Sequence, residues 1–222
     1  PLSKANDGIN TPLALHIGGY DYLPRDSMVR PNAYSPDKGA VNMKDGTLPL
    51  ITVAAAIAVT GCSTYATAPY SSDAETVVYL RDANIDPVSL GPFGGAGDKT
   101  SINCRAVGPI EAPEGEGFAQ FVRDAVADEL RLAGKYDSDS DVVINGELQE
   151  IDFSSVSGRW DIHLLLLSTN GEQMEVSETY DYSTSYFGET ACNQTAQALM
   201  PAVQNLVSKA VRSPEFAAMT RD

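Results

Sequence analysis

The sequence predicts an α+β domain over residues 76–216, in which a mostly antiparallel sheet of about four strands carries two helices on one face. Two observations lead to this fold class. Residues 116–133 and 190–212 repeat apolar side chains at helical spacing. Between them lie three runs that alternate like strands: DVVINGELQEIDFSS, GRWDIHLLLLST and EQMEVSETYDYSTSY.

The part of the domain before the first helix is expected to contain little regular structure. Residues 75–85, ETVVYLRDANI, predict a first strand because they are rich in residues that favour strands. Residues 86–114 are expected to be irregular except for a short strand in SINCRAV. GGAGDKT, residues 94–100, departs from the spacing of a phosphate-binding loop because Asp98 interrupts it, and a flexible loop is predicted instead.

The later elements carry clearer signals. The helix over 116–133 has an apolar face and should end at Gly134. That face consists of Phe118, Phe121, Val122, Ala125, Val126, Leu130 and Ala133. Asn170 and Gly171 predict a two-residue hairpin turn between the last two strands. Pro201 predicts a kink or a break in the final helix. Residues 217–222 are expected to form a C-terminal tail.

The net charge of −15 lies wholly after Cys62, because the basic and acidic side chains before it cancel. An acidic surface of this kind repels phosphate groups and anionic lipid heads. Nucleic-acid binding and purely electrostatic adhesion to membranes are therefore excluded from the expected functions.

An uncharged run, LPLITVAAAIAVT at residues 48–60, ends at Gly61 and Cys62. It is shorter than the roughly 20 residues that a spanning helix needs, and its length is typical of the apolar part of a signal peptide. The competing interpretation is a buried apolar helix that ends in a core cysteine.

The stretch AVTGC resembles the lipobox of bacterial lipoproteins. This resemblance implies that Cys62 receives a thioether-linked diacylglycerol, that the signal is cleaved on its amino side, and that a third acyl chain follows. It divides the chain into a signal peptide at 43–61 and an acylated, flexible tether at 62–75. Residues 1–42 are interpreted as an upstream segment or tag, with a genuine extension as the alternative. Ser63 implies sorting to the outer membrane.

With Cys62 assigned to the lipid, two cysteines remain, Cys104 and Cys192. An exported protein enters an oxidising compartment, where paired cysteines form disulfides. The sequence therefore predicts a Cys104–Cys192 disulfide, and two free buried cysteines are the alternative.

No motif for catalysis, a cofactor or a metal is evident in the sequence. His163, with Asp161 on the same strand face, is the one candidate base after Cys62, and no nucleophile motif accompanies it. DSDSD at 137–141 departs from a calcium loop at its sixth and twelfth positions and predicts a polar turn. The candidate interaction surface is a set of aromatic residues at strand spacing, with packing beneath a helix as the alternative. The set is Tyr180, Tyr182, Tyr186 and Phe187.

The order of elements, with AGKYD, INGEL and SPEF, resembles YajG-like small outer-membrane lipoproteins. The resemblance implies a non-enzymatic adaptor on the periplasmic face of the outer membrane that binds an envelope protein or glycan. A membrane-tethered hydrolase or a small-ligand-binding protein is the alternative, and His163→Ala would separate the enzyme from the adaptor.

Overall fold

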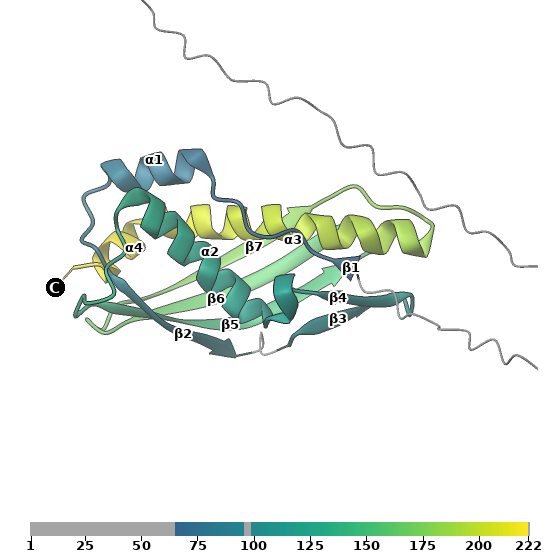
Figure 1. Ribbon diagram of the computed structural model, residues 1–222, viewed down its shortest axis with the longest axis horizontal. Helices are drawn as coiled ribbons and strands as arrows, with labels where there is room; N and C mark the ends of the chain where they lie inside the picture. Colours follow the sequence, from purple (N-terminus) through teal and green to yellow (C-terminus); the bar gives the residue numbers. More distant parts are fainter. Residues whose placement is uncertain (1–64, 96–98, 222) are drawn as a thin grey trace, which may run out of the picture. The chain divides into compact units, whose positions relative to one another are not determined.

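The computed structural model describes residues 65–95 and 99–221 (Figure 1). The elements in chain order are β1 (Tyr65–Ala66), α1 (Ala74–Asp82), β2 (Ser89–Gly95), β3 (Ser101–Cys104), β4 (Gly108–Glu111), a 3-10 turn (Pro113–Gly115), α2 (Phe118–Ala133), β5 (Val143–Ser154), β6 (Arg159–Ser168), β7 (Gln173–Asp181), α3 (Gly188–Val211) and α4 (Pro214–Met219). None of the helices within these ranges is long and apolar enough to cross a bilayer.

The main sheet has the strand order β2-β5-β6-β7. β5, β6 and β7 are antiparallel neighbours, whereas β2 runs parallel to β5 at one edge. α2 and α3 cover one face of this sheet (Figure 1). The predicted α+β class, with helices on one face of a mostly antiparallel sheet, is therefore confirmed. A second, small sheet of order β1-β4-β3 packs against α3.

The core lies between the main sheet and the helices, and the apolar periodicity of the sequence accounts for it. In β6 the alternate residues Trp160, Ile162, Leu164 and Leu166 are fully buried. All seven apolar residues predicted on one face of α2 are buried as well. α2 ends at Gly134, which adopts the left-handed conformation with a φ of 71°.

The hairpin predicted at Asn170 and Gly171 is present, but its loop is longer than two residues. β6 ends at Ser168 and β7 begins at Gln173. The Asn170 side chain donates hydrogen bonds to the carbonyls of Ala218 and Arg221. The loop is therefore shaped by a contact with the C-terminal residues, which local sequence does not reveal.

The strand predicted over 75–85 is wrong, because residues 74–82 form the helix α1. Asp73 caps this helix by accepting hydrogen bonds from the backbone N–H and the hydroxyl of Thr76. Thr76, Val77 and Leu80 are buried, which is the spacing of one helix face. Packing of that face and the N-cap outweigh the strand preference of the Val-Val-Tyr run.

The prediction that residues 86–114 are mostly irregular is also wrong, although the short strand in SINCRAV is confirmed as β3. β2 contains Gly91 and Pro92, which are tolerated because β2 is an edge strand. Its pairing with β5 shifts register between Leu90 and Phe93. The loop predicted over 94–100 begins inside β2, and residues 96–98 lie outside the described part.

The C-terminal part of the chain belongs to the domain. α3 continues through Pro201 as one helix, so the proline does not end it. α4 follows, capped by the Ser213 hydroxyl, and buries Phe216 and Met219 fully. Residues 217–219, expected in a tail, are thus part of a packed helix.

The entry segment, residues 65–73, was expected to be part of a flexible tether and instead contacts the domain at several points along its length. β1 pairs with β4, and the Thr67 hydroxyl donates to the carbonyl of Glu111 at 2.8 Å. The Tyr70 hydroxyl and the backbone N–H of Asp73 each donate to Oε1 of Glu129 at 2.7 Å. Of the expected tether, residues 62–64 lie outside the described part.

Glu129 is the buried acceptor that holds the entry segment against α2. Its side chain is fully buried, and its second oxygen, Oε2, has no hydrogen-bond partner among the described residues. Burial raises the pKa of the Glu129 carboxyl, although the hydrogen bonds from Asp73 and Tyr70 lower it. Burial and the hydrogen bond to Glu129 raise the pKa of Tyr70 as well. Burial is the larger of these effects, so the pKa of the Glu129 carboxyl lies above its ordinary value even though both hydrogen bonds favour the charged form.

We predict that Glu129→Gln removes a pH-dependent loss of stability. A carboxyl whose pKa is raised by folding stabilises the fold at pH values below its ordinary pKa of 4.5. This contribution is lost as the pH rises through the pKa of the folded state. Glutamine cannot ionise and still presents an acceptor. Urea unfolding between pH 4 and 7 should therefore show the variant gaining stability relative to the wild type as pH rises.

Glu129→Ala is the control. It leaves the Tyr70 hydroxyl and the Asp73 N–H without their acceptor and should cost about 1–3 kcal/mol. If the difference in free energy of unfolding between Glu129→Gln and the wild type did not change with pH, the raised pKa of Glu129 would be contradicted.

Candidate functional site

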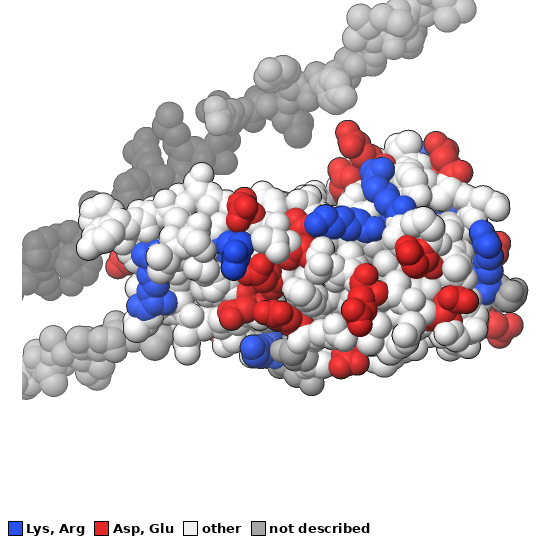
Figure 2. Space-filling model, turned by 180° about the vertical axis from the view of Figure 1, so that it is seen from behind, with Lys and Arg blue, Asp and Glu red and all other residues white. Residues whose placement is uncertain are grey.

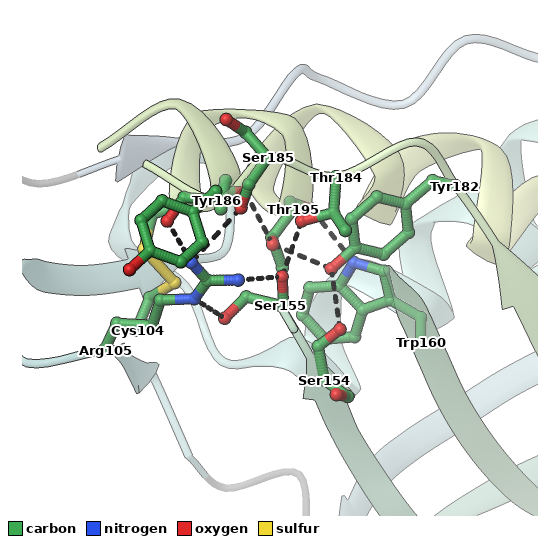
Figure 3. Close-up of a disulfide and its surroundings, with 12 residues drawn as sticks. Cys104, Arg105, Ser154, Ser155, Trp160, Tyr182, Thr184, Ser185, Tyr186 and Thr195 are labelled. Carbon is green, nitrogen blue, oxygen red and sulfur yellow. Dashed lines mark hydrogen bonds between the residues drawn. A yellow bond between two sulfur atoms is a disulfide. The ribbon is translucent and has the colours of Figure 1, made fainter. Parts of the chain in front are cut away.

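The disulfide between Cys104 and Cys192 joins the end of β3 to the first turns of α3 and confirms the predicted pairing (Figure 3). The two Cα atoms are 5.8 Å apart, and both side chains are fully buried. Because β3 belongs to the small sheet, the bond ties that sheet to a helix of the main layer. It fixes the loops at one end of the domain, where the candidate site lies.

Arg105 directly follows the disulfide and connects three loops (Figure 3). It lies in the β3–β4 turn with a φ of 48°, a conformation uncommon outside glycine. Its guanidinium donates to the hydroxyl and the carbonyl of Ser155 in the β5–β6 turn. It also donates to the carbonyls of Ser185 and Tyr186 in the β7–α3 loop, each at 3.2 Å. One side chain therefore holds all three loops together.

A second set of hydrogen bonds joins β6 and the first residue of the β7–α3 loop to α3. The Trp160 indole donates to the carbonyl of Thr195 at 2.9 Å, and the hydroxyls of Tyr182 and Thr195 are 2.7 Å apart. Burial raises the pKa of Tyr182. The loop approaches the β5–β6 turn so closely that a Cβ on Gly158 would lie 2.2 Å from the carbonyl oxygen of Tyr182. The base of the loop is therefore rigidly placed.

On this base lies an exposed group that we call the apolar tip: Val156, Tyr186 and Phe187. Their exposed fractions are 76%, 94% and 74%. The rings of Tyr186 and Phe187 meet edge to face, with centroids 6.1 Å apart. Val156 and Tyr186 line one open hollow of about 420 Å³ together with Arg105, Thr184 and Ser185.

The four aromatic residues predicted as an interaction surface separate into two pairs. Tyr180 and Tyr182 are half-buried and pack against the core, as the alternative interpretation expects. Tyr186 and Phe187 are exposed. Sequence reasoning missed Val156, whose only signal is an isolated apolar residue in the Ser-rich turn before Gly158.

His163 lies on the face of the sheet opposite the helices. Its Nε2 is 3.7 Å from Oε2 of Glu150, and both side chains are about half exposed. Asp161, the neighbour expected to orient it, instead binds Arg159 and accepts a hydrogen bond from Thr179. His163 lines none of five hollows that the surface of residues 65–95 and 99–221 contains, those at Asn84, Val156, Val78, Pro69 and Gln204.

The DSDSD segment at 137–141 lies in the connection between α2 and β5, where Asp137 accepts a hydrogen bond from the N–H of Asp139. Within the described ranges, no three His, Cys, Asp or Glu side chains gather as metal ligands would. Cys62 lies outside the described residues.

Comparison with known proteins adds no relative from which a role could be inferred. No family model matches the chain, and a search of curated proteins gives no significant match. The apolar tip and its support are therefore interpreted from their own chemistry.

We predict that replacing Cys104 and Cys192 together by serine lowers the free energy of unfolding by about 2–5 kcal/mol, because the bond closes a long loop of the unfolded chain. Urea unfolding of the oxidised proteins measures the difference. Cys62→Ser is the matched control and should unfold like the wild type. Equal stability of the double variant and the wild type would show that the disulfide does not constrain the fold.

Proposed function

We propose that this chain is a lipid-anchored protein of the bacterial cell envelope. Its α+β domain stands on the periplasmic face of the outer membrane and binds another envelope protein or glycan without catalysing a reaction. The anchor is the acylated Cys62, and Ser63 directs the protein to the outer membrane.

The distribution of the three cysteines is the observation that carries this proposal. Cys104 and Cys192 form a disulfide, which is the state expected in an oxidising compartment. The remaining cysteine, Cys62, is the one that ends an apolar run in the lipobox-like AVTGC. Pairing and sequence context thus support export and lipidation independently of each other.

The surface charge supports anchoring by lipid rather than by electrostatic attraction. On the face drawn in Figure 2, acidic side chains occur in several separate groups with basic side chains among them, and wide uncharged areas lie between. A domain with a net charge of −15 gains nothing from anionic lipid heads. Acyl chains contribute about 0.8 kcal/mol per buried methylene, so two or three of them suffice for stable attachment.

The surroundings of His163 support a binding role rather than hydrolysis. The imidazole is about half exposed on the sheet face opposite the helices, Glu150 lies 3.7 Å away, and Asp161 is engaged by Arg159 and Thr179. A general base needs a partner that orients it and a nucleophile within hydrogen-bond reach. The adaptor role is therefore the function that the geometry supports best.

We predict that Cys62→Ser abolishes incorporation of radiolabelled palmitate in bacterial cells that produce the full chain. The thiol is the atom that would receive the diacylglycerol, and serine cannot replace it in a thioether. The label on immunoprecipitated protein measures the effect.

The matched control is the double variant of Cys104 and Cys192 to serine, which should keep the label. Labelling that persists in Cys62→Ser would overturn the lipoprotein assignment.

A further inference from the structure

The apolar tip combines three exposed apolar side chains on two loops that the fold holds rigidly in place. Val156, Tyr186 and Phe187 are each exposed by more than two thirds. Arg105 fixes both loops by hydrogen bonds to Ser155 and to the carbonyl of Tyr186. Single exposed apolar residues are ordinary, but a fixed group of them indicates a contact surface.

The chain enters the domain at the same end. β1 runs parallel to β4, and Tyr65 pairs with Ile110, so β1 begins on the side of the β3–β4 turn. That turn contains Arg105, which is bonded to the tip. Figure 1 also shows the β3–β4 hairpin and the start of α3 at one end of the domain, with β1 close to them and α1 toward the opposite end.

The lipid anchor must lie close to this end. Cys62 precedes Tyr65 by three residues. Three residues span at most about 11 Å when fully extended. An acylated Cys62 therefore holds the β1 end of the domain near the membrane surface, and any contact there is effectively intramolecular, so a weak contact suffices.

We propose that the apolar tip lies in the interfacial region of the membrane, where Val156, Tyr186 and Phe187 contact lipid. The inference rests on the proposed anchoring at Cys62 and assigns the bilayer as the partner of this site. Tyrosine is suited to the interface because its ring is apolar and its hydroxyl remains hydrated. The other faces of the domain, including the face that bears His163, are then left for the periplasmic partner.

The charges near the tip indicate that apolar insertion, and not charge, provides the attraction. Arg105 is engaged by carbonyl oxygens of the two loops. Glu189 is exposed in the first turn of α3, next to the tip, and would be repelled by anionic lipids. Contact with zwitterionic lipid is therefore expected, and salt should not weaken it.

Quenching by brominated lipid tests the proposal. Phe187→Trp in the full chain places a reporter at the tip, and Val78→Trp is the control because Val78 is 53% exposed on α1, toward the opposite end. The native Trp160 is fully buried and gives a constant background. Each protein is anchored to phosphatidylcholine vesicles with or without brominated acyl chains.

We expect brominated lipid to reduce the added emission at residue 187 at least twofold and to leave that at residue 78 unchanged. Equal quenching at both positions, or none at either in vesicle-bound protein, would overturn the proposal. So would a photo-crosslinker at residue 187 that captures protein instead of lipid in intact cells.

A second arm separates this test from the proposed lipidation. Unacylated full chain is coupled through the Cys62 thiol to a maleimide-bearing phosphatidylethanolamine in the same vesicles. Absence of acylation in cells then refutes the natural anchor, whereas the quenching difference in this arm still decides whether the tip contacts lipid.

Discussion

The disulfide between Cys104 and Cys192 is the constraint on which the loop end of the domain depends. β3 and β4 have four residues each and β1 has two, so the small sheet could not be stable alone. The disulfide attaches it to α3 and places Arg105 where its guanidinium reaches the β5–β6 turn and the β7–α3 loop. The rigid display of Val156, Tyr186 and Phe187 therefore follows from one covalent bond and the arginine beside it.

Glu129 attaches the entry segment to the domain by accepting hydrogen bonds from Tyr70 and Asp73. Burying a carboxyl costs stability, and its hydrogen bonds with Tyr70 and Asp73 offset part of that cost. The contact holds the entry segment in a defined place, because it continues the attachment that begins where β1 pairs with β4. The chain therefore joins the domain at Tyr65, and the path from an acylated Cys62 is short. A short connection limits how the domain can be oriented at a membrane, and a long flexible one would not.

The parts of the fold that could be predicted from sequence are those in which periodicity and burial agree. α2 and β6 repeat apolar residues at the spacing of their own secondary structure, and the buried face of α2 was predicted residue by residue. α1 was missed because its valines favour strands locally, whereas the Asp73 cap and burial of Leu80 decide for helix. β2 was missed because Gly91 and Pro92 suggest a loop unless the strand is known to be at an edge. At the site, the Cys104–Cys192 pairing was predicted because assigning Cys62 to the lipid leaves two cysteines. The role of Arg105 depends on loops 50 and 80 residues away, to which no local pattern points.

Two chemical states of cysteine are expected in one molecule: the proposed thioether at Cys62 and the disulfide between Cys104 and Cys192. Both can be read in one measurement, non-reducing peptide mapping by mass spectrometry of the protein extracted from the membranes of cells that produce the full chain. We expect a mature chain that begins at an acylated Cys62 and a linked pair of peptides that contains Cys104 and Cys192. A chain that retains residues before Cys62 with that thiol unmodified, or with free thiols at Cys104 and Cys192, would contradict this expectation.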